Sequence, residues 1–573
     1  MFSLEDSLQA GASHLESLVD AQGRTYFNVF RTTPAEAVTD WPDFVDLPSR
    51  YFEAAAMVEP IIGRGVHTAG VLRRRLFSHI QADGLAYRPD TPISHSEAVL
   101  FDQSRLLYAL TTWAMHDPAD GEIRARLSGL VGGLQRRATL VDGYAHFGKI
   151  DACWWGTLIR PLLQAGLLLA EASYVDFARA LARGILDHSD LYGTGGLFCG
   201  HTHSHLGTAA GILACGIISG EGRFVQRVRE ILEYARSIST EFGFVPEVAQ
   251  REDDLVSCET CAIMDYLDVA LLLARHVDAG YWELVERVAR NHLVESQVAQ
   301  RQWLNFAPAL PDEDGIIRSD LERRLAGAFA GWSAPHGLLA YEETFWPEWV
   351  KTPRMYPRYL GKVRALQNCC AGAGIRALHQ VWSNIAWFDG DCLQVNLVMD
   401  KRINGARITS LLPLEGKVVI QLERKCDVRV RAPAVTGNQP LEVALHSAGR
   451  AVRVEPVQRG PFLEVGNLAA GDRIEITFPQ PTREEIIAIG NPDRQQYRFR
   501  VAWKGNTVTE VQPAPDNARS GYSRVEKRDV RLFYGEDTPG RLYQRRADLE
   551  PGNKPAPSPA SLDSQRIDWY RLR

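Results

Sequence analysis

The first two thirds of the chain carry apolar residues at the spacing of α-helices. In TLIRPLLQAGLLLAEA, the residues Leu158, Leu162, Leu163 and Leu167 recur at the steps of one buried helix face. The same period recurs in further stretches, at 51–62, 100–115, 174–186, 224–238, 261–276 and 375–387. Short breaks that contain Gly and Asp separate these stretches. About a dozen helices in hairpin pairs would suit an (α/α) toroid, in which inner helices surround one central cleft.

Beyond residue 390 the pattern becomes alternating. GKVVIQLE, DVRVR and RIEITF each place apolar side chains at every second position. Short alternating runs separated by Pro, Gly and Asn are typical of an antiparallel β-sandwich. The later stretch EPGNKPAPSPAS is rich in Pro and Ser, and we expect it to form an extended arm. The sequence therefore predicts a mainly α domain followed by an all-β domain.

Composition narrows the class of protein. A chain of 573 residues is too long for one compact core, so two or three domains are expected. The net charge of -6 gives no basic surface for nucleic acid, and no stretch has the roughly 18 apolar residues of a membrane-spanning helix. The first residues carry acids and lack the apolar core of a signal peptide. Nine scattered cysteines do not form a disulfide framework, which predicts a cytoplasmic protein with reduced thiols.

Two cysteine pairs are the strongest candidates for chemistry. SCETC contains Cys258, Glu259 and Cys261 at the head of an apolar stretch, and LQNCCAGAG contains the neighbouring Cys369 and Cys370. Adjacent cysteines rarely bond to each other because the short ring strains the disulfide. Thiolates and carboxylates are ligands that Zn²⁺ prefers, although this spacing matches neither a zinc finger nor a zinc ribbon. The pattern therefore leaves three interpretations open: a zinc site, a reactive thiolate, or buried inert cysteines.

The combination of ETCA, the apolar helix after it and a CC pair before IRAL resembles glycoside hydrolase family 127, the β-L-arabinofuranosidases. Weaker matches are LPSRYFEAAAMV, QADGLAY, VERVARNHL and DCLQVNL. The resemblance implies an (α/α)6-barrel catalytic domain at 1–390 and β-sandwich material at 391–573. It also implies retaining hydrolysis by a zinc-bound cysteine nucleophile, which would be Cys369. The zinc ligands would be Glu259, Cys261, Cys369 and Cys370.

The family also uses a general acid/base that lies upstream of ETCA. In EFGFVPEVAQREDDLVSCETC the resemblance favours Glu247 for this role. Glu241 is the rival, because this loop is a few residues shorter than the family pattern. The residues alone also allow a simpler interpretation, in which Glu247 is a solvated loop acid.

Four further residues are candidates for sugar binding. Glu286 in VERVARNHL matches a family Glu that hydrogen-bonds the sugar, and its alternative is an exposed helix acid paired with Arg290. His205 in HTHSH matches a sugar-binding His at the head of a helix, with a second metal site or a surface loop as alternatives. Trp332 and His336 in GWSAPHGLLAYEETFW suit stacking and hydrogen bonding to a sugar, and a packed loop is their alternative.

The chain departs from the family at several positions. AGAG follows the CC pair where the family usually has Pro-Pro-Asn. Gln103, Ser104, Trp154 and Trp155 lie in the stretches where the family has histidines. The residues expected to carry out the reaction are thus retained, whereas several of those expected to contact the sugar differ. The sequence therefore leaves the sugar, its anomer and its linkage open.

The resemblance thus implies a zinc-dependent, retaining and exo-acting glycoside hydrolase that acts on a small oligosaccharide or glycoside. Two other functions are alternatives. A polysaccharide lyase or unsaturated-uronide hydrolase could use the same helical toroid, and a non-catalytic carbohydrate-binding protein could hold a structural zinc. No nucleic-acid or membrane partner is expected, and a homo-oligomer is left open.

Overall fold

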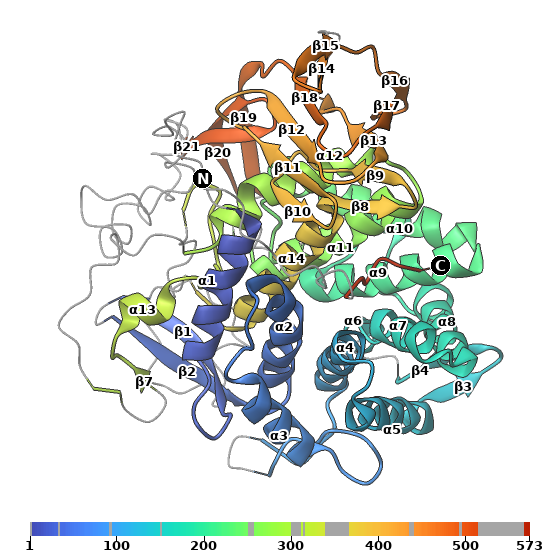
Figure 1. The fold of residues 1–573 in the computed structure, drawn as a ribbon. Helices are drawn as coiled ribbons and strands as arrows, with labels where there is room; N and C mark the ends of the chain where they lie inside the picture. Colours follow the sequence, from blue (N-terminus) through green and yellow to red (C-terminus); the bar gives the residue numbers. More distant parts are fainter. Residues whose placement is uncertain are drawn as a thin grey trace.

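The structure is a computed structural model, shown in Figure 1. It describes residues 3–32, 35–90, 94–148, 152–249, 257–298, 311–312, 316–337, 366–434, 441–491, 495–513 and 567–572. Helices fill the lower part of the view, and the strands of the C-terminal part fill the upper part. The predicted order, a helical N-terminal part followed by an all-β region, is therefore confirmed.

The helices of the N-terminal part include one at each predicted stretch of helical period, together with others that those stretches did not indicate. They are α1 (Leu4–Ser17), α2 (Asp46–Ile62), α3 (Ala69–His79), α4 (Leu100–His116), α5 (Gly121–Arg137), α6 (Ala152–Gly156), α7 (Ile159–Leu169), α8 (Ala172–His188), η1 (Thr194–Gly196), α9 (Thr202–Ser219), α10 (Gly222–Ser237), α11 (Thr260–His276), α12 (Tyr281–Val288), the π-helical η2 (Ala289–Leu293), α13 (Leu321–Leu325) and α14 (Cys369–Ile385). The last predicted stretch runs too far, because Ala386 and Trp387 already belong to a strand.

The helical part also contains strands that the helical prediction did not include. A three-stranded sheet joins β1 (Thr25–Thr32), β2 (Ala35–Asp43) and β7 (Ile316–Ile317). Two short pairs are β3 (Thr139–Val141) with β4 (Tyr144–His146), and β5 (Gly200–His201) with β6 (Val248–Ala249). TYFNVFRT in β1 is rich in aromatic and β-branched residues, which favour strands, whereas strands of two or three residues are too short to show a period.

Within its described residues, the all-β region contains three sheets. Its strands are β8 (Ala386–Asp389), β9 (Cys392–Val395), β10 (Lys401–Ile403), β11 (Ala406–Ser410), β12 (Lys417–Leu422), β13 (Cys426–Arg431), β14 (Glu442–Ser447), β15 (Arg450–Arg453), β16 (Val457–Arg459), β17 (Phe462–Leu468), β18 (Arg473–Thr477), β19 (Thr482–Asn491), β20 (Gln495–Lys504) and β21 (Thr507–Pro513). The sheet orders are β10-β11-β12-β18-β14-β15, β16-β17-β13-β9-β8 and β19-β20-β21. The pairings are antiparallel except that of β13 with β9, which is parallel.

The all-β region is joined to the helices by buried polar contacts on α12 and η2. Arg431 of β13 pairs with both Glu283 and Glu286 of α12. Asn506, between β20 and β21, donates to Glu283 Oε1 at 2.7 Å and accepts from Arg287 Nε at 3.1 Å. These contacts connect the helical part to the all-β region, because the charged side chains of each part have partners in the other.

The described C-terminal residues return to the helical part. Arg160 of α7 donates to the carbonyl oxygen of Trp569, and the Trp569 ring lies 5.1 Å from that of Tyr108 in α4. Asp568 pairs with Arg275 of α11 at 2.9 Å. Figure 1 shows this segment against the helices, whereas the predicted Pro-rich arm lies outside the described residues. Of the helices described, none combines the length and apolar character needed to cross a membrane.

Candidate metal centre and active site

The two cysteine pairs meet at the start of two helices. Glu259 is the N-cap residue of α11 and Cys261 lies in its first turn, while Cys369 and Cys370 are the first two residues of α14. A helix N-terminus carries partial positive charge, which favours thiolates over thiols. The fold therefore brings together two pairs of side chains that lie about a hundred residues apart in the sequence. Both pairs lie at helix N-termini, where negative charge is stabilised.

The four side chains form a compact buried cluster. The Cys261 sulfur lies 3.7 Å from those of Cys369 and Cys370, and these two lie 3.8 Å apart. Oε1 of Glu259 accepts from the Cys369 thiol at 3.5 Å. All four donor atoms lie within 4.8 Å of one another, and all nine cysteines of the chain are free thiols. This donor set could hold a metal ion.

The three thiols of the cluster differ in the direction in which their pKa is shifted. Burial opposes ionisation of Cys261, but its hydrogen bonds with Cys369 and Cys370 and the charge of Arg50 outweigh it, so the pKa of Cys261 lies well below its usual value. Burial, together with the charge on Cys261, raises the pKa of Cys369 and of Cys370 well above the usual value. Without a cation between them, the three sulfurs therefore accommodate one negative charge more easily than three.

Cys258 is a packed neighbour of the cluster. Its sulfur accepts a hydrogen bond from the backbone of Val245 at 3.3 Å, and it is not among the four grouped donors. Its backbone pairs with Ser333 through two hydrogen bonds of 2.9 Å. The segment around Ala330 thus holds both halves of the cluster, since Ala330 also accepts from Thr260 and forms a bridge with Leu366.

Two glycines of AGAG allow α14 to approach its neighbours closely. A Cβ atom on Gly372 would lie 2.8 Å from Cβ of Arg50 in α2, and 3.0 Å from its carbonyl oxygen. A Cβ atom on Gly374 would lie 2.4 Å from the ring of Phe329. The departure from the family pattern after the CC pair is therefore tied to the helix contacts that place Cys369 and Cys370.

A cationic group lies beside the cluster and was not among the predicted site residues. Arg50 donates to the Cys261 sulfur at 3.7 Å and forms an ion pair with Asp46. His203 receives hydrogen bonds at Nε2 from Arg50 and Arg105, so its proton is on Nδ1, which donates to Asp265. These residues could not be found from local spacing, because they come from four separate helices.

The HTHSH string starts α9 and directs its histidines differently. Nε2 of His201 contacts Glu259 at 3.0 Å, and this hydrogen bond and charge raise the pKa of His201 although burial opposes protonation. His205, the predicted sugar ligand, stacks on Phe198 with ring centroids 4.8 Å apart, and burial lowers its pKa to about 4. The structure therefore brings His201 and His203, rather than His205, to the cluster. The surface-loop alternative is wrong, because His203 and His205 are buried.

Glu247 lies beside the cysteine segment. Its carboxylate accepts from the Ser257 hydroxyl at 3.1 Å, and its backbone nitrogen donates to the Ser257 carbonyl at 2.9 Å. The next residue, Val248, pairs with His201 across β5 and β6. Since His201 contacts Glu259, Glu247 belongs to the surroundings of the cluster.

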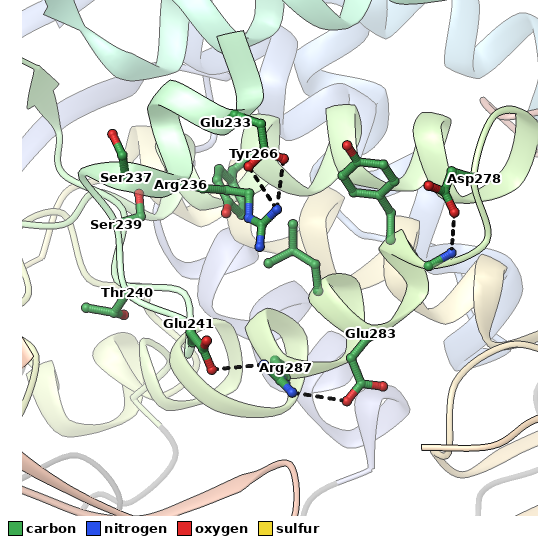
Figure 2. Close-up of a pocket in the computed structure, with 13 residues that line it drawn as sticks. Glu233, Arg236, Ser237, Ser239, Thr240, Glu241, Tyr266, Asp278, Glu283 and Arg287 are labelled. Carbon is green, nitrogen blue, oxygen red and sulfur yellow. Dashed lines mark hydrogen bonds and ion pairs between the residues drawn. The ribbon is translucent and has the colours of Figure 1, made fainter. Parts of the chain in front are cut away.

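Glu241, the rival acid, lies in a separate pocket of about 610 Å³ among α10, α11 and α12 (Figure 2). Its side chain is 55% exposed and pairs with Arg287 at 2.9 Å and Arg483 at 3.0 Å. Figure 2 also shows Arg236 paired with Glu233, so the arginines of this pocket are neutralised within it. The described lining residues include no cysteine or histidine.

Glu286 occupies a buried ion-pair network rather than an exposed helix surface. It pairs with Arg290 at 3.1 Å, as its alternative interpretation required, but it is fully buried and also binds Arg431 and the backbone of Val398. Burial opposes ionisation, yet these two arginines hold the pKa of Glu286 below its usual value. The contacts of Glu286 are those of a residue that joins α12 to the all-β region.

Trp332 and His336 lie in the segment that pairs with Cys258. Both are buried, and the His336 ring lies 5.4 Å from that of Phe499 in β20. Ser333 lies between them, and its hydroxyl group forms a hydrogen bond of 2.9 Å with Nε2 of His292. The segment is thus packed between the cluster and the β19-β20-β21 sheet, and Tyr341 of the same string lies outside the described residues.

Comparison with known proteins supports the fold. No protein-family model and no curated protein matches the sequence. Among solved structures, a family 127 β-L-arabinofuranosidase from Geobacillus stearothermophilus T6 superposes with a TM-score of 0.55 at 15% identity, over 88% of this chain and 80% of that one. A protein described as a glycoside hydrolase gives 0.54 at 14% identity, over 81% and 77%. The chain therefore resembles glycoside hydrolase family 127 in fold, as its sequence motifs predict.

Proposed function

We propose that the protein is a retaining, exo-acting glycoside hydrolase that uses Cys369 as nucleophile beside a bound Zn²⁺. The observation that carries this proposal is the buried cluster of Glu259, Cys261, Cys369 and Cys370. The likeness in fold to a family 127 β-L-arabinofuranosidase supports it. We also propose that the helices form an (α/α)6 barrel and that a β-sandwich follows it. The substrate would be the terminal residue of a small oligosaccharide or glycoside.

The donor set suits zinc in type and in spacing. Tetrahedral sites with zinc–sulfur bonds of about 2.3 Å place their sulfur atoms about 3.8 Å apart. The observed sulfur–sulfur distances of 3.7 to 3.8 Å match that edge. When bound, Zn²⁺ would stabilise the deprotonated forms of all three thiols, which burial alone disfavours.

The protein groups then have distinct roles in two displacement steps. The Cys369 thiolate forms a bond to the anomeric carbon as the bond to the leaving oxygen breaks, and the Glu247 carboxyl group gives its proton to that oxygen. In the second step the Glu247 carboxylate takes a proton from water, and the water oxygen replaces sulfur on the same carbon. Two inversions at this carbon give net retention of configuration.

The test is release of nitrophenol from 4-nitrophenyl β-L-arabinofuranoside and a panel of other nitrophenyl glycosides. The Cys369→Ala variant should lose turnover, whereas Cys392→Ala, which removes a thiol in β9, should retain it. Denaturing mass spectrometry during turnover should show one glycosyl unit on Cys369. Unchanged turnover in Cys369→Ala would contradict the proposal.

A second candidate function is carbohydrate binding with a structural metal. The observation that favours it is that all four donors come from the protein and are buried, as in closed structural zinc sites. In that case chelation would lower the melting temperature, and no glycoside of the panel would be hydrolysed by the zinc-loaded protein. The two candidates therefore differ in turnover and agree in metal content.

A further inference from the structure

Arg105 of α4 is a buried charge without a carboxylate partner in the part of the chain that the structure describes. The residue is 4% exposed, and its Nε atom has no hydrogen-bond partner there. Its hydrogen bond runs from the guanidinium group to Nε2 of His203 at 3.0 Å. A buried guanidinium group normally carries an ion pair, because desolvation of an unpaired charge is costly.

The neighbouring arginines are paired and so differ from Arg105. Arg50 has Asp46 and the Cys261 sulfur as partners. Arg376 pairs with Glu53 at 3.2 Å. Burial and the like charge of Arg50 lower the pKa of Arg105 more than the charges of Asp46 and Asp265 raise it, so these carboxylates compensate its charge only in part.

Aromatic side chains and histidines connect Arg105 to the metal cluster. The Arg105 guanidinium lies 4.5 Å from the ring centroid of Phe101, and Trp154 meets Phe101 edge-on at 4.8 Å. Trp154 lies 6.0 Å from His201, which contacts Glu259. Phe101 and Trp154 are half-buried and the His201 side chain is 29% exposed, so this group of side chains has an accessible face.

The chemistry of this face suits a sugar that bears one negative charge. Aromatic rings stack on the apolar face of a sugar ring, and a guanidinium group offers a planar pair of donors to an oxyanion. Arg50 pairs with Asp46 and donates to the cluster, whereas Arg105, among the described residues, forms no hydrogen bond or ion pair with any of the four metal donors. An anion that reached Arg105 would supply the missing counter-charge.

We propose that the substrate carries a singly charged anionic group, a carboxylate as in a uronic acid or a sulfate ester, and that Arg105 binds it. This inference rests on the proposed function, since it names the substrate class of the same site. It makes Arg105 a residue that determines substrate specificity. A different substrate would also account for the replacement of the histidines that the family has in the stretches around Gln103 and Trp154.

The experiment compares matched nitrophenyl glycosides that differ only in the charged group. The pairs are glucuronide with glucoside and galacturonide with galactoside, and the 6-sulfates of the two neutral sugars form the third arm. Wild-type protein should prefer one acidic member over its neutral partner. Arg105→Met should lower kcat/KM for that member by about 10- to 100-fold and change the neutral one by less than about twofold.

Two further variants and one binding assay complete the test. Arg105→Lys keeps the charge but loses the planar pair of donors, so it should fall between wild type and Arg105→Met. Arg236→Met, in the pocket of Figure 2, is the matched control for loss of one arginine and should behave as wild type. Calorimetric titration of the zinc-loaded Cys369→Ala variant with the free acidic and neutral sugars reports binding without turnover.

Each outcome decides the inference separately from the proposed function. Preference for an acidic member that Arg105→Met selectively reduces supports the inference, and preference that Arg105→Met leaves unchanged overturns it. Arg105-dependent binding of an acidic sugar without any turnover supports the inference and refutes hydrolysis alone. Preference for neutral members overturns the inference and leaves hydrolysis standing. Equal losses on acidic and neutral members in Arg105→Met, with reduced zinc content, would assign Arg105 to the metal cluster and overturn it. Absence of both turnover and acidic-sugar binding also overturns it.

Discussion

Helix α14 approaches α2 closely at Gly372. For this reason we expect Gly372→Ala to destabilise the folded state, whereas helix propensity alone predicts that it stabilises it. Exchange of a helix glycine for alanine normally stabilises the folded state by about 0.5–1 kcal/mol. In Gly372→Ala, however, the new methyl group would lie 2.8 Å from Cβ and 3.0 Å from the carbonyl oxygen of Arg50. Because these atoms are backbone or attached to it, the side chain cannot swing away and the two helices must separate.

The magnitude follows from the two opposing effects. Insertion of a methyl group into a packed interface costs about 1–3 kcal/mol, and contact with backbone favours the upper half of that range. After the gain in propensity, Gly372→Ala should lower the free energy of unfolding by about 1–2 kcal/mol. Separation of the helices would also move Arg50 from the Cys261 sulfur, so we expect weaker metal binding.

The assay is urea unfolding followed by circular dichroism, with metal content measured on the same samples. Gly129→Ala is the matched control, because Gly129 is an exposed position of α5 and its Cβ would lie 4.0 Å from the nearest atom, Cα of Gly84. This control should gain about 0.5–1 kcal/mol. If Gly372→Ala were stabilised as much as Gly129→Ala, the packing argument for the AGAG stretch would be refuted.

Three further predictions concern the metal, the interface and the acid/base. Cys261→Ser should reduce zinc to a small fraction of one ion per chain by elemental analysis, and full zinc content would contradict the assigned ligand set. Arg431→Met should cost about 3–5 kcal/mol in chemical unfolding, because it leaves Glu286 buried without this cation. Since the folded pKa of Glu286 lies below 4.5, this stabilisation is present above pH 4.5 and lost as the pH falls through the folded pKa, so the difference from wild type should shrink on acidification. Glu247→Gln should lower kcat about 10²- to 10⁴-fold on glycosides with poor leaving groups, whereas an equal loss in Glu241→Gln would contradict the assignment.

Local patterns of the sequence were sufficient for the order of the two parts and for the type of many of their longer elements, but not for β1, β2 and the short strands of the helical part. Helical periods in the predicted stretches 157–172 and 261–276 and alternation in 416–423 correspond to α7, α11 and β12. These predictions succeed because periodicity follows from which face of an element is buried. The pairing of SCETC with CC also came from the sequence, through its resemblance to a family rather than from spacing.

The contacts between elements could not be derived from the sequence. Glu286 has the i,i+4 spacing to Arg290 that is typical of an exposed helix pair, but Arg431 from the all-β region turns it into a buried network. In HTHSH the sequence favoured His205, while the direction of α9 turns His201 toward Glu259. Side-chain direction at a helix start depends on where neighbouring helices pack, which a local pattern does not contain.

By itself, the sequence determined a helical part, an all-β part and two cysteine pairs with the chemistry to bind a metal. The resemblance to a family placed the two pairs in one site, and the tertiary structure gave that cluster its geometry. Only the tertiary structure decided that Arg50 and His201 contact the cluster, and that Arg105 is buried nearby without a carboxylate partner among the described residues. The physical reason is that metal donors, ion pairs and unpaired charges depend on distances of a few ångström between α2, α4, α9, α11 and α14. Those distances are set by helix packing, including the missing side chains of Gly372 and Gly374.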